Sequence, residues 1–122
     1  MNLKILFTVN ALVFALPAFA HEAENGPHGG RVTEAGIYHV ELVAKNDLIE
    51  VFLTDASSKP VSAAGFKGVA IIVVDGKSAR VTLESTGNIG LSGNAPTLLP
   101  AQPKGVVQIT SPDGKTFQAK YN

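Results

Sequence analysis

The side chains best suited to chemistry in this sequence are three histidines that lie close together near its start. No histidine occurs in the 83 residues after them, and four glutamates share their stretch of chain. Imidazole nitrogen and carboxylate oxygen are ligands for divalent ions such as Cu(II) and Zn(II). The spacing therefore predicts a divalent-metal site, with the candidate ligands His21, His28, His39 and Glu41.

The lack of sulfur-containing ligands narrows the choice of metal. There is no cysteine, which excludes disulfides, thiolate metal sites and a nucleophilic thiol. The one methionine is Met1, so a thioether site for Cu(I) lacks donors. The expected cofactor is a divalent metal ion, with Cu(II) favoured and Zn(II) as the alternative.

Residues 1–20 have the features of a cleaved secretory signal peptide. Lys4 precedes an apolar run over residues 5–16, Pro17 ends any helix, and the tripeptide AFA at 18–20 is a small-x-small cleavage site. The run is shorter than the roughly 20 apolar residues that span a membrane. We therefore expect a periplasmic protein that has no stable membrane anchor after cleavage and begins at His21.

His21 gains a second ligand if it becomes the first residue of the mature protein. Its α-amine and its imidazole can both be neutral at about pH 7.5, and together they chelate one ion. A third nitrogen, from His28 or His39, completes an arrangement suited to the tetragonal preference of Cu(II). Small exported copper carriers with a β-sandwich fold use such a terminal histidine, and this chain resembles them in size and layout.

Each histidine also has an interpretation that needs no metal. His21 is then a solvated residue that follows the signal peptide. His28 lies in the sequence GPHGG, where Pro27 and the glycines fix the backbone path, so it is either a ligand or a turn residue. His39 and Glu41 lie two positions apart on one strand face, as in many exposed pairs.

The rest of the sequence has the alternating pattern of short strands. Residues 38–44 and 48–54 predict one hairpin across Asn46-Asp47, and residues 69–74 and 78–84 predict a second across Asp75-Gly76-Lys77. A third hairpin joins 106–110 to 116–121. Residues 85–104 contain three prolines and three glycines and predict a long loop with a short strand at 89–91, and no stretch of the mature chain has a helical period.

This pattern predicts an all-β fold, in the form of a small antiparallel β-sandwich of immunoglobulin-like type, with a small barrel as the alternative. The expected organisation is a signal peptide over 1–20, an N-terminal arm with His and Gly over 21–35, and a β-sandwich domain over 36–122. One face of each strand forms the core. The side chains predicted to be buried are Tyr38, Val40, Leu42, Val51, Leu53, Ile71, Val73, Val81, Leu83, Val107, Ile109 and Phe117.

Charge and composition argue against two further classes of function. Basic and acidic side chains number ten each, without the clustered Lys and Arg of a nucleic-acid-binding protein. The serines lie far along the chain from the histidines, so no nucleophile, base and orienting group form a recognisable catalytic set. We expect a protein that is not an enzyme and has no nucleic-acid partner.

Three short motifs resemble a known family. They are HGGRV at 28–32, GIYHVELV at 36–43 and VFLTD at 51–55. In this combination they resemble small periplasmic proteins of Gram-negative bacteria, which are related to the N-terminal segment of periplasmic adaptor subunits in heavy-metal efflux systems of the RND type. The resemblance implies His28 as the recurrent candidate ligand, together with Glu41, and an efflux adaptor as partner. The chain lacks the coiled-coil hairpin and lipoyl-like regions of a full adaptor.

The ligand types and the resemblance together predict a periplasmic divalent-metal-binding protein that acts as a carrier, a buffer or a heavy-metal efflux accessory. The alternative is a structural or protein-interaction β-sandwich that docks to an envelope efflux component without metal. Exposed edge strands and the 85–104 loop would serve that docking.

Overall fold

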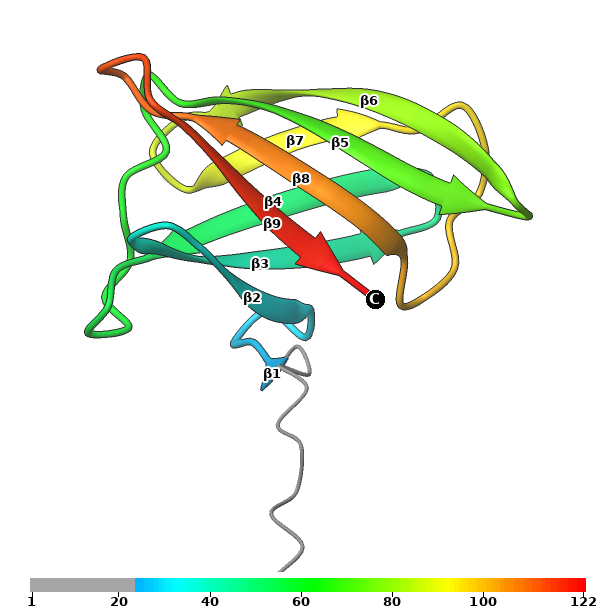
Figure 1. Cartoon of the computed structure of the whole chain (residues 1–122), viewed down its shortest axis with the longest axis horizontal. Helices are drawn as coiled ribbons and strands as arrows, with labels where there is room; N and C mark the ends of the chain where they lie inside the picture. Colours follow the sequence, from blue (N-terminus) through cyan, green and yellow to red (C-terminus); the bar gives the residue numbers. More distant parts are fainter. Residues whose placement is uncertain (1–23) are drawn as a thin grey trace, which may run out of the picture.

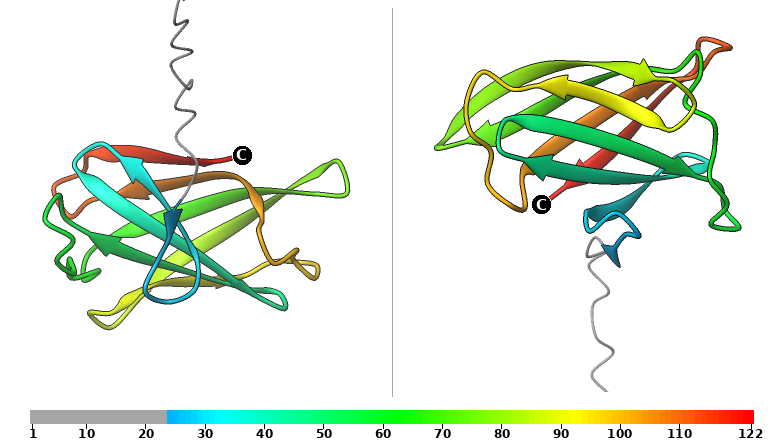
Figure 2. Two further views of the ribbon diagram at one scale, coloured as in Figure 1. Left: turned by 90° about the horizontal axis from the view of Figure 1, so that it is seen from below. Right: turned by 180° about the vertical axis from the view of Figure 1, so that it is seen from behind.

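The structure, a computed structural model, describes residues 24–122 and arranges them as nine strands in one antiparallel sheet (Figure 1). The order of strands across the sheet is β1-β2-β3-β4-β7-β6-β5-β8-β9. The sheet curls until β2 approaches β9, so it is nearly closed (Figure 2). The strands are β1 (Glu24–Asn25), β2 (Arg31–Ala35), β3 (Tyr38–Lys45), β4 (Leu48–Thr54), β5 (Lys67–Val74), β6 (Lys77–Thr86), β7 (Gly90–Asn94), β8 (Lys104–Thr110) and β9 (Thr116–Tyr121).

The predicted all-β antiparallel fold is confirmed, whereas its division into the two sheets of an immunoglobulin-like sandwich is not. All strands within residues 24–122 belong to one sheet, an arrangement closer to the small barrel that the sequence left as the alternative. Residues 24–35, which fall in the predicted arm, supply β1 and β2 of this sheet. The predicted signal peptide and His21 lie outside the described residues. In the part of the chain that the structure describes, no helix is long and apolar enough to cross a membrane.

The three predicted hairpins are present. Lys45 pairs with Leu48 across the first turn, and Thr110 pairs with Thr116 in the third hairpin. In the second, Asp75 and Gly76 have φ values of 50° and 76°, the left-handed conformation that a two-residue hairpin turn requires. The predicted loop over 85–104 contains β7, which fills the place between β4 and β6.

The prediction that Ile71 and Val73 are buried is wrong. They are 37% and 45% exposed, and Ala70 and Ile72 face the core instead. The apolar run over residues 69–74 does not alternate with polar residues, so the turn alone sets which face points inward. The predicted three-residue turn over 75–77 would pair Val74 with Ser78. The observed turn has two residues and pairs Val74 with Lys77. This shift of one position reverses the two faces of β5; the other predicted core residues are buried or half-buried.

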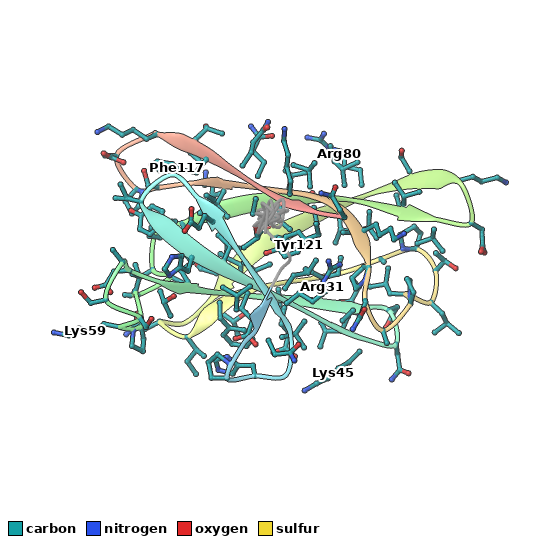
Figure 3. All side chains as sticks on the ribbon, turned by 60° about the horizontal axis from the view of Figure 1, so that its bottom comes forward. Arg31, Lys45, Lys59, Arg80, Phe117 and Tyr121 are labelled. Atoms are coloured by element: carbon teal, nitrogen blue, oxygen red, sulfur yellow. The ribbon has the colours of Figure 1, made fainter. Side chains whose placement is uncertain are left out.

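Side chains close the remaining gap between β2 and β9. Tyr121 of β9 is buried and donates a hydrogen bond from its hydroxyl to the backbone oxygen of Val40, at 2.6 Å. Arg31 of β2 lies over the Tyr121 ring, 6.0 Å from its centre (Figure 3). The same guanidinium donates to the carbonyl oxygens of Pro103, at 3.4 Å, and Asn122, at 2.6 Å. These contacts join the two ends of the sheet where strand pairing is lacking.

Replacing Tyr121 by phenylalanine is expected to lower the free energy of unfolding by about 1 kcal/mol, because one buried hydrogen bond is lost. Burial raises the pKa of the Tyr121 hydroxyl above its usual value. In the unfolded chain a tyrosine ionises above about pH 10. The folded state holds Tyr121 neutral, so its contribution to stability is present below that pH and is lost as the pH rises above it.

Urea unfolding of the wild type and Tyr121→Phe, at neutral pH and above about pH 10, measures both effects. The alkaline loss of stability should be smaller in Tyr121→Phe. Tyr38→Phe is the control, because the Tyr38 hydroxyl makes no hydrogen bond within residues 24–122. Equal alkaline losses in the wild type and Tyr121→Phe would contradict the prediction.

Candidate functional site

Glu41 lies on the outer face of the sheet and yet is only 3% exposed. It belongs to β3, where it pairs with Val32 of β2 and Phe52 of β4. Its neighbours in the strand, Val40 and Leu42, face the core, so Glu41 points away from it. The loop between β1 and β2, residues 26–30, folds back over this face and covers the carboxylate.

A tight turn at Gly26-Pro27-His28-Gly29 gives the loop its path. The Gly29 N–H donates to the Gly26 oxygen at 3.1 Å, and the Gly26 N–H donates to the Gly30 oxygen at 2.8 Å. Gly29 has a φ of 79°, which favours glycine. A Cβ on Gly26 would lie 2.3 Å from the carboxyl carbon of Glu41, so this glycine allows the loop to approach β3 closely.

The loop directs its backbone N–H groups at the Glu41 carboxylate. Oε2 accepts hydrogen bonds from the N–H groups of His28 and Gly30, both at 2.9 Å. Oε1 lies 2.7 Å from Nδ1 of His28. An ionised carboxylate buried without partners is costly, and these three contacts offset that cost. Glu41 therefore fixes the loop to the sheet, while the loop shields its charge.

His28 is held in one orientation from two sides. Its ring stacks on that of Phe52, with 3.7 Å between ring centres and 7° between planes, and its Nδ1 faces Glu41. An ionised carboxylate only accepts hydrogen bonds, so Nδ1 carries the proton and Nε2 has the lone pair in the neutral ring. The side chain is 46% exposed, and Nε2 has no hydrogen-bond partner among residues 24–122. One imidazole nitrogen of fixed direction is thus available to a metal ion or a proton.

Among the described residues, the structure brings together two of the four predicted ligands, His28 and Glu41. His39 lies two positions before Glu41 and pairs instead with Glu34 of β2, with 3.7 Å between Nε2 and Oε1. No three His, Asp or Glu side chains within residues 24–122 are grouped closely enough to hold a metal ion. His21 lies outside the described part of the chain.

A groove of about 520 Å³ opens beside this pair. His28 and Glu41 line it together with apolar side chains of β4, the segment after β4 and the turn between β6 and β7, among them Phe52, Val61 and Ile89. Electrostatic interactions are stronger beside such apolar walls than in open water. A ligand at His28 would therefore also contact the side chains of this groove.

Sequence reasoning misses Phe52, although a signal for it exists. In residues 48–54 the core-facing positions are Ile49, Val51 and Leu53, which leaves Phe52 on the outer face. An aromatic ring on that face, opposite Glu41 in the hairpin, indicates a surface that something must cover. His28 is the side chain that covers it.

Fold and site together define a class of protein. It is a small all-β protein of one nearly closed antiparallel sheet, in which a buried glutamate of β3 holds a half-exposed histidine of the β1–β2 loop. No protein-family model, curated protein or solved structure matches the chain. The functional conclusion therefore rests on the geometry of the site.

Proposed function

We propose that this protein binds a divalent metal ion through Nε2 of His28. The observation that carries this proposal is the 2.7 Å contact between His28 Nδ1 and Glu41 Oε1. Metal-binding histidines usually donate their second ring N–H to a carboxylate or carbonyl, which orients the ring and makes the ligating nitrogen more basic. Glu41 and Phe52 hold His28 in the manner that such a ligand requires.

Glu41 acts behind the ligand in this proposal and does not bind the metal itself. Both of its oxygens already have hydrogen-bond partners, and its side chain is 4% exposed. A direct bond from Glu41 to a metal would break these contacts and open the loop. Glu41 is therefore a positioning residue. The further nitrogen comes from His21 or from His39, whose Nε2 would have to leave its contact with Glu34 to bind the ion.

Cu(II) is the metal we favour, with Zn(II) as the alternative. The chain offers nitrogen and oxygen donors and no thiolate, and such donors suit both ions. The predicted export signal and the resemblance to proteins related to heavy-metal efflux adaptors support a periplasmic role. There the protein carries or buffers the ion, or serves an efflux system as an accessory whose partner is the periplasmic adaptor.

Calorimetric titration of the exported protein with Cu(II) and Zn(II) tests this function, with Glu41→Gln as the informative variant. The glutamine oxygen can accept the two backbone N–H groups, but its NH₂ group then faces Nδ1 and donates to it. The imidazole proton moves to Nε2, so the affinity should fall about 10-fold to 100-fold. Long-range ¹H–¹⁵N NMR spectra of both proteins report the tautomer of His28.

Glu34→Gln is the matched control, because it removes the same charge beside His39, at a glutamate that is 73% exposed. It should leave the His28 tautomer unchanged and alter the affinity by much less. Absence of binding by the wild type, or equal affinities in the wild type and Glu41→Gln, would contradict the proposal. The better explanation would then be the alternative function, a protein-interaction domain that docks to an envelope efflux component without metal.

A further inference from the structure

Charged side chains are unevenly divided between two parts of the described chain. Residues 24–66 contain six acidic and three basic side chains, whereas residues 67–122 contain three acidic and six basic ones. The first part forms β1 to β4, and strands β6, β5, β8 and β9 of the second part lie side by side beyond β7 (Figure 1). The sheet therefore has an acidic side, which carries the His28 loop, and a basic side.

The outer surface of the basic side has an aliphatic centre. Ile71 and Val73 of β5 are 37% and 45% exposed. Val106 of β8 is the cross-strand partner of Ile71, so its side chain projects on the same side of the sheet. An exposed aliphatic cluster of this kind on a small protein indicates a surface for another molecule.

Three cations surround this centre, each paired across strands with one of the aliphatic residues. Arg80 pairs with Ile71, Lys104 with Val73 and Lys120 with Val106, and none of the three forms an ion pair with another described residue. A hollow of about 410 Å³ opens between Lys104 and Lys120, with Val73 and Val106 in its wall. The basic–aliphatic face consists of Ile71, Val73, Arg80, Lys104, Val106 and Lys120.

We propose that the basic–aliphatic face binds the surface of an anionic phospholipid bilayer. The headgroup phosphates supply the negative charge that these cations lack within the protein, and lysines reach them while their stems cover apolar surface. Ile71 and Val73 contact the boundary between headgroups and acyl chains. Protein interfaces are instead depleted in lysine and enriched in aromatic residues. This face has two lysines, and the one aromatic residue that lines its hollow, Tyr121, is only 2% exposed.

The charge division also orients the bound protein. The anionic surface attracts the basic side and repels the acidic side, which turns the β1–β2 loop and His28 away from the bilayer. In Figure 1 β5 and β6 lie at the top and β1 and β2 at the bottom. Figure 3 places Arg80 on the opposite side of the molecule from Lys45 and Lys59. His28 therefore stays open to solvent in the bound protein.

Sedimentation of the exported protein with vesicles tests this proposal. Vesicles of phosphatidylcholine with phosphatidylglycerol should retain the wild type, and vesicles of phosphatidylcholine alone should not. Each basic residue near an anionic surface contributes about 1 kcal/mol, or about five-fold in binding, so Lys104→Glu with Lys120→Glu should lower retention by at least about 10-fold. Ile71→Ser with Val73→Ser should also lower retention. Thermal unfolding confirms that each variant is folded.

Lys45→Glu with Lys59→Glu is the matched control, because it changes the net charge equally on the other side of the molecule. This variant should be retained like the wild type. No retention of the wild type by the anionic vesicles, or an equal loss in the control variant, would overturn the proposal. Capture of an acidic protein that depends on Lys104 and Lys120, without vesicle binding, would overturn it in favour of a protein partner.

Discussion

Replacing His28 by alanine is expected to lower the affinity of the protein for Cu(II) and Zn(II) by at least about 10-fold to 100-fold. Glu41 and Phe52 fix the direction of the His28 ring, and the loss of a ligand costs at least as much as the loss of the group that supports it. Calorimetric titration at about pH 7.5 measures the change. Binding to the wild type should also weaken below about pH 6, because protons compete for imidazole nitrogen.

The single variants His21→Ala and His39→Ala identify the remaining ligands. At least one of them should also bind more weakly, because Cu(II) prefers several ligands in a tetragonal arrangement. Urea unfolding is the control for His28→Ala, whose backbone N–H can still donate to Glu41 together with that of Gly30. Unchanged affinity in all three variants would contradict the proposed metal site. A protein-interaction domain that docks without metal would then be the better explanation.

Replacing Gly30 by alanine is expected to lower the free energy of unfolding by about 3 kcal/mol and to weaken metal binding with it. The added Cβ would lie 2.4 Å from the backbone oxygen of Leu42 and 2.7 Å from Cγ2 of Val43. Strand β3 is held between β2 and β4 and cannot move aside, so the loop must lift. Glu41 then loses the N–H of Gly30. Urea unfolding and metal titration of the same variant measure the two effects.

Gly29→Ala is the matched control, because it changes the neighbouring glycine of the same motif. Gly29 has a φ of 79°, and a Cβ there would meet nothing within 4 Å. A residue with a Cβ in this conformation costs roughly 1–2 kcal/mol, so Gly29→Ala should be less harmful than Gly30→Ala. A larger loss of stability at Gly29 would contradict the close packing of the loop on β3.

The all-β class and the hairpins follow from the sequence alone, because their signals are local. Alternating apolar residues and a turn of Asn, Asp or Gly lie within a few positions of each other. Residue types and spacing likewise single out His28 and Glu41 as candidates for the site. The location of β7 and the near closure of the sheet have no such local signal, because they depend on pairing between segments that are far apart in the chain.

The tertiary structure decided how the two site residues are used. His28 and Glu41 are separated by 13 positions, and their spacing allows Glu41 to be an exposed ligand. Only the fold of the β1–β2 loop over β3 buries Glu41, aligns its oxygens with three N–H groups and stacks His28 on Phe52. In the proposed metal site, these contacts give Glu41 the role of orienting His28 instead of binding the ion itself.

The residues of the basic–aliphatic face can be read from the sequence, but their exposure depends on the tertiary structure. The sequence contains the lysines and the apolar run over residues 69–74, but it predicts Ile71 and Val73 in the core. A turn of two residues at Asp75-Gly76 turns them outward, and pairing with β6 and β8 places Arg80 and Lys104 beside them. A strand repeats every two residues, so a shift of one position exchanges its inner and outer faces, and composition alone cannot distinguish the two.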